Sequence, residues 1–223
     1  MNKQPLLDLF DQEYEFSSFI ATGNELTVVS LQSFSTQFTH IYGDSLTGKT
    51  HLLKSWVNLA NRRYNAGIYL TPDDIAQFSI YDIDLNTYRF IAIDDIDNAA
   101  EEQQIAIFDL YNRIKLHNLD NYLLTSSTIN LNYSDLRVDL KTRIHSGVIF
   151  ALKILSDKNL VTALSIYAKR EGIKFGDHEI EFLVNHCNRN LGQLIQILND
   201  ISLFAISNKK SITVHLIKQY LQS

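Results

Sequence analysis

A phosphate-binding loop constrains the fold of this chain more than any other feature of its sequence. Residues 43–50 have the pattern Gly-x-x-x-x-Gly-Lys-Thr. A short apolar stretch, 38–42, precedes the loop and predicts a β-strand, and an amphipathic stretch, 51–64, follows it and predicts an α-helix. The glycines let backbone N–H groups curl around a phosphate, and the start of the helix adds the positive end of its dipole. The pattern therefore predicts a P-loop on an α/β fold.

The residues of the loop have distinct expected roles. In a P-loop the lysine reaches the β- and γ-phosphates, and the last hydroxyl binds Mg²⁺, so these roles fall to Lys49 and Thr50. We expect ADP or ATP with Mg²⁺ as ligands, and the sequence leaves the resting nucleotide open. The residues expected to contact the nucleotide here are Gly43, Asp44, Ser45, Leu46, Thr47, Gly48, Lys49, Thr50 and His51.

Short apolar stretches alternate with helical patterns in the first two thirds of the chain. The expected strands after the loop are 67–70, 90–93, 122–126 and 148–152. The stretch 90–93 is apolar throughout and is followed by Asp94 and Asp95, which is typical of a buried parallel strand. A carboxylate there can hold magnesium, and we assign this role to Asp94. Asp95 would face the γ-phosphate and orient or deprotonate the attacking water; the alternative is that one acid only caps the next helix.

The pattern changes after residue 153. Four helical stretches follow with no strand between them, and they are 156–170, 177–187, 191–206 and 213–221. The sequence therefore predicts an α/β fold with a parallel sheet, followed by a small all-helical domain. We divide it into an N-terminal arm (1–12), a nucleotide-binding core (13–153) and a helical lid (154–223).

Charge and composition restrict the classes of function. The 223 residues include 20 Lys and Arg against 25 Asp and Glu, a formal net charge of -5, so no overall positive field would draw the chain onto nucleic acid. A single cysteine excludes a disulfide framework. Neither a signal peptide nor a run of about 20 apolar residues is visible, so we expect a cytoplasmic protein without membrane contact.

Several segments together resemble the AAA+ core of the replication initiator DnaA. They are the loop 43–53, the strand end 93–96 and the segment 14–24, which is similar to the segment by which that family packs the nucleotide base. The resemblance spans roughly residues 14–223 and implies an AAA+ P-loop NTPase core with a helical lid.

Other features of the sequence restrict the resemblance to one group of DnaA-related proteins. Residues 106–114 are similar to the same helix in Hda, the DnaA-related regulator that switches the initiator off. The stretch between Leu70 and Phe90 is too short for the initiator's additional DNA-contacting helix, and the chain ends at Ser223, after the lid. We therefore expect an Hda-like protein that lacks the DNA-binding domain of the initiator.

The N-terminal arm fits this resemblance. Residues 4–10, Gln-Pro-Leu-Leu-Asp-Leu-Phe, are similar to the short motif by which proteins bind the β sliding clamp. Leu7, Leu9 and Phe10 would fill an apolar pocket, and the amide of Gln4 would orient them through a hydrogen bond. The spacing departs from the usual motif, since either Gln4 is displaced or Leu6 stands in its position. The alternative is an apolar arm folded on its own domain.

The resemblance also implies an arginine finger. AAA+ proteins hydrolyse ATP between subunits, and an arginine of one subunit neutralises the charge that grows on the γ-phosphate bound by the next. The segment 140–147 aligns with the family's finger motif and places Arg143 at the finger position. Arg137 is an alternative, and for both the simpler interpretation is a surface ion pair. Arg113 follows the Asp94–Asp95 strand end and would face the partner.

Two departures from the family predict weak intrinsic ATP hydrolysis. The initiator carries an acid after the strand 122–126, where this chain has serine and threonine. Thr125 or Ser126 could still hydrogen-bond the γ-phosphate or its water. The lid helix of the family presents a sensor arginine where this chain has Gly192, and Arg189, one helical turn earlier, could replace it.

These features leave three functions. The preferred one is a negative regulator that binds the sliding clamp, reaches DNA only through it, and stimulates the hydrolysis of ATP bound to DnaA. A self-sufficient AAA+ ATPase, such as a helicase loader or a DNA-remodelling motor, would instead show strong ATPase activity and act as a homo-oligomer. A small-molecule P-loop kinase would leave Arg143 and the arm without a role. The sequence does not settle the homo-oligomeric state.

Overall fold

The computed structural model describes residues 14–77, 80–117 and 119–222. It divides into two compact units, Met1–Ile154 and Leu155–Ser223, each with its own apolar core. None of the helices in the described ranges is long and apolar enough to cross a membrane.

The first unit is an α/β fold. Its strands are β1 (Phe38–Tyr42), β2 (Gly67–Leu70), β3 (Phe90–Ile93), β4 (Tyr122–Ser127) and β5 (Val148–Ala151). Its α-helices are α1 (Glu25–Ser33), α2 (Lys49–Tyr64), α3 (Pro72–Gln77), α4 (Glu101–Leu116) and α5 (Val138–His145). The 3₁₀ helices among the described residues of this unit are η2 (Ile80–Asp82), η3 (Ile96–Asn98) and η4 (Leu131–Tyr133).

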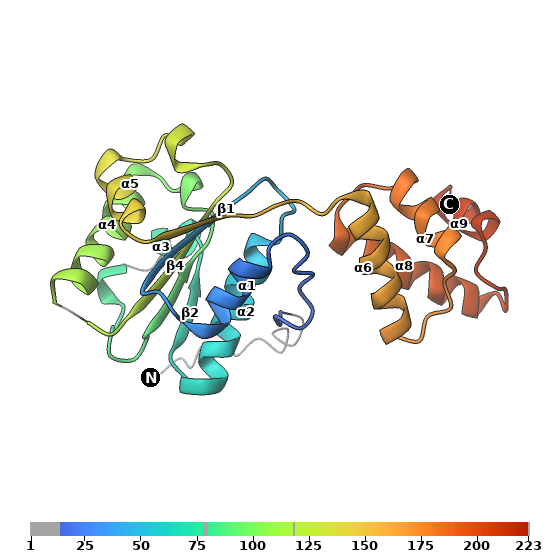
Figure 1. Cartoon of the computed structure of the whole chain (residues 1–223), viewed down its shortest axis with the longest axis horizontal. Coiled ribbons are helices and arrows are strands. Elements are labelled where there is room, and N and C mark those ends of the chain that lie inside the picture. Colours follow the sequence, from blue (N-terminus) through green and yellow to red (C-terminus); the bar gives the residue numbers. More distant parts are fainter. Residues whose placement is uncertain (1–13, 78–79, 118, 223) are drawn as a thin grey trace. The chain divides into compact units, whose positions relative to one another are not determined.

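The five strands form one parallel sheet in the order β2-β3-β4-β1-β5. The strand that enters the P-loop, β1, therefore lies between β4 and β5. Figure 1 shows α1 and α2 on one side of this sheet and α4 and α5 on the other. Tyr42 at the end of β1 is in register with Ser127 at the end of β4. The expected parallel α/β fold is confirmed, and the carboxyl ends of β1, β3 and β4 meet at one edge of the sheet, where ligands bind in such folds.

Alternate residues of the central strands point to opposite faces of the sheet, and each face has its own layer of helices. Ile91 and Ile93 of β3 are fully buried in the cluster that includes α4 and α5. Phe90 and Ala92 are buried in the cluster that includes α1 and α2. Burial of a side chain such as Ile91 contributes roughly 1.5–3 kcal/mol, so the apolar run of β3 fixes the middle of a three-layer fold.

The second unit is entirely helical. Its helices are α6 (Asp157–Arg170), α7 (Asp177–His186), α8 (Leu191–Ser207) and α9 (Val214–Leu221). Fully buried leucines from α6, α7 and α8, such as Leu164, Leu183 and Leu198, form its core with Ile217. The hydroxyl of Ser156 accepts a hydrogen bond from the Asn159 N–H and caps α6.

Candidate nucleotide site

The P-loop connects β1 to α2, and two of its positions require glycine. Gly48 has φ 88°, and a Cβ there would lie 2.7 Å from Cε2 of Phe19. A Cβ at Gly43 would lie 2.9 Å from the carbonyl oxygen of Leu152. The loop is thus enclosed by Phe19 on one side and by the chain after β5 on the other, and larger side chains at these positions would displace one or the other.

Lys49 places a cation inside the loop. The side chain is only 7% exposed, and its Nζ donates hydrogen bonds to the carbonyl oxygens of Gly43 (2.8 Å) and Asp44 (3.4 Å). Lys49 is also the first residue of α2, and the first N–H groups of a helix have no partner within the helix. A buried ammonium beside a helix N-terminus fits a phosphate group.

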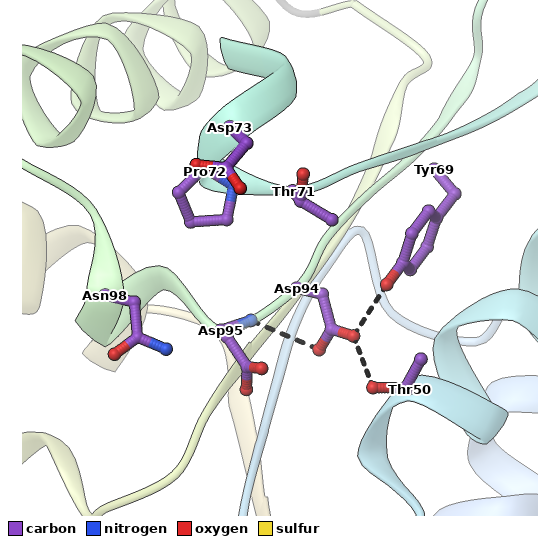
Figure 2. Close-up of a pocket in the computed structure, with 8 residues that line it drawn as sticks. All are labelled: Thr50, Tyr69, Thr71, Pro72, Asp73, Asp94, Asp95 and Asn98. Carbon is purple, nitrogen blue, oxygen red and sulfur yellow. Dashed lines mark hydrogen bonds between the residues drawn. The ribbon is translucent and has the colours of Figure 1, made fainter. Parts of the chain in front are cut away.

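The fold brings the two residues expected to hold Mg²⁺ into contact. Asp94, at the end of β3, is 3% exposed. Its Oδ2 accepts hydrogen bonds from Oγ1 of Thr50 (2.6 Å) and from the phenol of Tyr69 (2.8 Å), as Figure 2 shows. Its Oδ1 accepts from the hydroxyl of Ser126 and from the backbone N–H of Asp95 (3.1 Å). Sequence reasoning found Thr50 and Asp94 but not Tyr69.

This oxygen-rich set fits magnesium. Mg²⁺ prefers oxygen ligands and is usually bound by one or two protein groups together with substrate phosphates and water. In the described ranges no group of three or more His, Cys, Asp or Glu side chains could hold a metal alone. Thr50 and Asp94 would therefore hold the ion together with a nucleotide. Magnesium would neutralise phosphate charge there.

Asp95 lies beside this pair in a strained and charged position. Its φ is 45°, in the left-handed region, which is uncommon for an aspartate and is often found at functional sites. Burial raises the pKa of Asp95, the charge of Asp94 raises it further, and Lys49 opposes both. Within the described part of the chain, Oδ1 of Asp95 is buried without a hydrogen-bond partner. Such a carboxylate is suited to accept a proton.

A pocket of about 290 Å³ opens beside these two acids. Figure 2 shows side chains from α2, from the ends of β2 and β3, and from the start of α3 around it. The lining residues are Thr50, Tyr69, Thr71, Pro72, Asp73, Asp94, Asp95 and Asn98. Burial raises the pKa of the Tyr69 phenol, and the charge of Asp94 adds to the shift, so Tyr69 is a hydrogen-bond donor to the acid.

The segment expected to pack the nucleotide base lies against the start of α2. The ring of His51 is 5.4 Å from the ring of Tyr14 and 5.6 Å from that of Phe19. Nε2 of His51 lies 3.0 Å from the carbonyl oxygen of Glu15, and burial lowers the pKa of this imidazole. His51 therefore joins this segment to the P-loop helix.

The end of the same segment is fixed to the chain that follows β5. The side-chain amide of Asn24 donates to the carbonyl oxygen of Lys153 (3.0 Å), and its Oδ1 accepts from the Lys153 N–H (2.8 Å). Asn24 is buried. This pair of hydrogen bonds fixes the end of the segment to the chain after β5.

The hydroxyls expected to sense the γ-phosphate are bonded within the protein. Oγ1 of Thr125 is 2.8 Å from Nδ1 of His40, and the hydroxyl of Ser126 donates to Asp94. Nε2 of His40 is 3.0 Å from the hydroxyl of Ser127, which donates to the carbonyl oxygen of Ile129. Burial lowers the pKa of His40 to about 3, so it is neutral. His40 is a further residue that sequence reasoning left without a role.

The two candidate finger arginines differ in their contacts. Arg143 of α5 is half-buried, and its guanidinium carbon lies 5.7 Å from the ring centroid of Phe108. No carboxylate among the described residues forms an ion pair with it. Arg137 pairs with Glu101 (3.0 Å) and Asp139 (2.8 Å). Arg143 therefore keeps an uncompensated charge, and Arg137 does not.

Two other predicted arginines are bonded to their own unit. Arg113 donates hydrogen bonds of 3.4 Å to the carbonyl oxygens of Ile80 and Ile83, which supports the turn after α3. Arg189 pairs with Asp157 (3.0 Å) within the helical unit. Gly192 lies in the first turn of α8 and is exposed. The predicted clamp-binding residues Gln4, Leu7, Leu9 and Phe10 lie outside the described residues.

Comparison with known proteins gives a family match for the helical unit and a fold match for the chain. Residues 157–221 match the family model of the Hda lid domain. The fold is similar to domain III of the replication initiation protein DnaA from Thermotoga maritima, with a TM-score of 0.78, 17% identity and coverage of 94% of this chain and 96% of that one. The chain thus combines a helical domain of the Hda lid family with an AAA+ fold similar to that of DnaA.

Further matches agree with this. The chain is 28% identical to an uncharacterized protein of Haemophilus influenzae over 99% of both chains. AMPPCP-bound DnaA from Aquifex aeolicus has a TM-score of 0.72 and 21% identity, with coverage of 88% of this chain and 67% of that one. A RuvB structure from Thermotoga maritima has a TM-score of 0.69 at 13% identity, covering 91% and 67%. At these identities, the solved structures establish the AAA+ fold.

Proposed function

We propose that this Hda-like protein binds a nucleotide with Mg²⁺, attaches to the β sliding clamp through residues 4–10, and stimulates the hydrolysis of ATP bound to DnaA. Arg143 supplies the finger that reaches the ATP of the partner. The initiator is then left in its ADP form, which prevents a second round of initiation. The family of the lid and the DnaA-like core support DnaA as the partner.

The contacts of Arg143 carry this proposal. A finger must present a full positive charge to a γ-phosphate on another chain. Stacking on Phe108 orients the guanidinium without neutralising it, whereas an ion pair such as that of Arg137 would compensate the charge. Arg143 also lies in the last turn of α5, where a cation is favoured by the helix dipole.

The chain's own site favours retention of a nucleotide over rapid turnover. Gly192 supplies no side chain where the family has a sensor arginine, and Arg189 is paired with Asp157. The hydroxyls of Thr125 and Ser126 are bonded to His40 and Asp94. The DnaA relative from Aquifex aeolicus binds AMPPCP, and the P-loop here fits the same class of ligand. The nucleotide of this chain therefore has a mainly structural role.

The deciding experiment measures hydrolysis of radiolabelled ATP preloaded on DnaA, with clamp-loaded DNA present. The wild-type chain should stimulate hydrolysis, and Arg143→Ala should reduce the stimulation by roughly 10³-fold or to background, as expected for an arginine finger. Arg137→Ala is the matched control and should retain stimulation, because its charge is already compensated. Nucleotide binding by each variant is measured in parallel.

Two results would contradict the proposal. Full stimulation by Arg143→Ala would exclude this residue as the finger. No stimulation by the wild-type chain, together with rapid ATP hydrolysis by the chain alone, would favour a self-sufficient AAA+ motor instead.

A further inference from the structure

The phenol of Tyr69 occupies an acceptor position on the acid that is expected to hold magnesium. Tyr69 lies near the end of β2, and its hydroxyl donates to Oδ2 of Asp94 over 2.8 Å. The same oxygen accepts from Thr50 over 2.6 Å (Figure 2). Tyr69 thus occupies an acceptor position on the same oxygen that binds the P-loop hydroxyl.

All acceptor positions of Asp94 are in use. An ionised carboxylate offers about four lone-pair positions for hydrogen bonds. Four donors fill them: Thr50 and Tyr69 on Oδ2, and the Ser126 hydroxyl and the Asp95 N–H on Oδ1. A magnesium ion that keeps its waters needs an acceptor on this carboxylate. One of the four donors must therefore leave before the acid can serve the ion.

Tyr69 is the donor that can leave. Ser126 is fully buried in β4, and the Asp95 N–H belongs to the backbone at the end of the sheet. The Thr50 hydroxyl can bind the ion through its oxygen and still donate its hydrogen to Asp94. Tyr69 is only half-buried, and its side chain lines the 290 Å³ pocket, so the ring has space to turn.

A second contact holds Tyr69 in its present position. The ammonium of Lys54 lies 5.2 Å from the centroid of the Tyr69 ring and 4.6 Å from that of Tyr14. These cation–π contacts fix the ring from the side of α2. Because Tyr14 belongs to the base-packing segment, the position of Tyr69 depends on both sides of the nucleotide site.

We propose that Tyr69 is a latch on Asp94: its hydroxyl occupies the acceptor position that a magnesium-bound water needs, and so weakens the contribution of Mg²⁺ to nucleotide binding. The inference rests on the proposed nucleotide site and is independent of the arginine finger. Tyr69 is a positioning residue, since it acts through Asp94. With this hydrogen bond in place, Mg²⁺ contributes little to the affinity of the protein for nucleotide.

The test compares the affinity for a fluorescent ADP analogue in excess Mg²⁺ and in EDTA. The ratio of the two dissociation constants reports the contribution of the metal. Tyr69→Phe keeps the ring and its contact with Lys54 but removes the donor. We expect the dissociation constant in EDTA, divided by that in Mg²⁺, to rise on the order of tenfold in this variant. This size is expected because a hydrogen bond to a charged group is stronger than one between neutral groups.

Two further variants make the result specific. Tyr81→Phe also removes a phenol–carboxylate hydrogen bond, to Asp109, but away from Asp94, so its ratio should match the wild type. In an Asp94→Asn background, Tyr69→Phe should have no further effect, because the oxygen that the latch blocks no longer belongs to a carboxylate.

The outcomes separate the latch from the nucleotide site. A Tyr69→Phe variant that binds nucleotide with an unchanged or reduced ratio would refute the latch alone. A wild-type chain that binds no nucleotide in either buffer would refute the proposed site and the latch with it.

Discussion

The buried imidazole of His40 makes the stability of the α/β unit depend on pH. His40 is 1% exposed, and its two ring nitrogens lie within hydrogen-bond distance of Thr125 and Ser127. Burial lowers its pKa from 6.5 to about 3. Below pH 6.5 the unfolded chain binds a proton that the folded chain does not bind until about pH 3. The free energy of unfolding therefore falls as the pH drops through this window.

The size of the effect follows from the unfolded pKa. Each pH unit below 6.5 costs about 1.36 kcal/mol while the folded imidazole stays neutral. Between pH 7.5 and pH 5.0, about 1.5 of these units lie below the unfolded pKa, so His40 accounts for a loss of about 2 kcal/mol. This value does not depend on the folded pKa as long as that lies well below 5.

The assay is urea unfolding at pH 7.5 and 5.0, followed by the fluorescence of Trp56. Trp56 is the single tryptophan of the chain and is 3% exposed in the α/β core, so its signal reports this unit. His40→Gln removes the titrating group and keeps a polar side chain. It should lose about 2 kcal/mol less than the wild type between the two pH values. His117→Gln, exposed at the end of α4 in the same unit, serves as the control.

An equal loss of unfolding free energy in the wild type and in His40→Gln would refute the reasoning. The two proteins count as equal if their losses of free energy between the two pH values agree to within about 0.5 kcal/mol, the scatter with which independent effects add. In that case the folded chain protonates His40 as readily as the unfolded chain does.

Two further substitutions test the geometry of the site. Gly48→Ala combines a positive φ with a Cβ 2.7 Å from Phe19 and should lower the free energy of unfolding, measured by Trp56 fluorescence, by about 1–3 kcal/mol. Gly23→Ala, in the same unit, also has a positive φ, but the nearest atom to its Cβ is Cδ of Lys153 at 3.7 Å, so equal losses in both variants would exclude the steric contribution. Asp95→Asn should stabilise the chain at pH 7.5, because burial and Asp94 raise the pKa of Asp95 and the folded state disfavours its charge. The gain should vanish as the pH falls through that pKa towards 4, and a gain that persists there would have another origin.

Local sequence patterns predict those strands whose two ends are marked by polar or turn-forming residues. The strands 67–70 and 90–93 have the expected bounds because apolar runs with clear ends can only be buried. Helix α3 was missed, although Pro72 at its first position and the hydrogen bond from the Thr71 N–H to Asp74 are ordinary start signals. Thr71 and Pro72, which follow the strand 67–70, are the start of this helix.

The sequence predicts the site residues that belong to a motif. It does not predict contacts between side chains that only the folded chain brings together. The contact between Thr50 and Asp94 follows from the P-loop and the strand end together. Tyr69 and His40 were not found, because their partners come from strands whose order in the sheet the sequence does not state. For the same reason, the sequence offers Thr125 or Ser126 as a hydrogen bond to the γ-phosphate or its water, but it does not predict the hydrogen bond from Ser126 to Asp94.

The place of β1 in the sheet has a consequence during synthesis. The strand that carries the P-loop is made early, but its neighbours are residues 123–127 and 148–151. At roughly 5–20 residues per second, β1 emerges on the order of ten seconds before its second neighbour exists. Until then at least one of its edges lacks a partner, and pairings of this kind are slow to form. The proposed nucleotide site can therefore form only once nearly the whole α/β unit has left the ribosome.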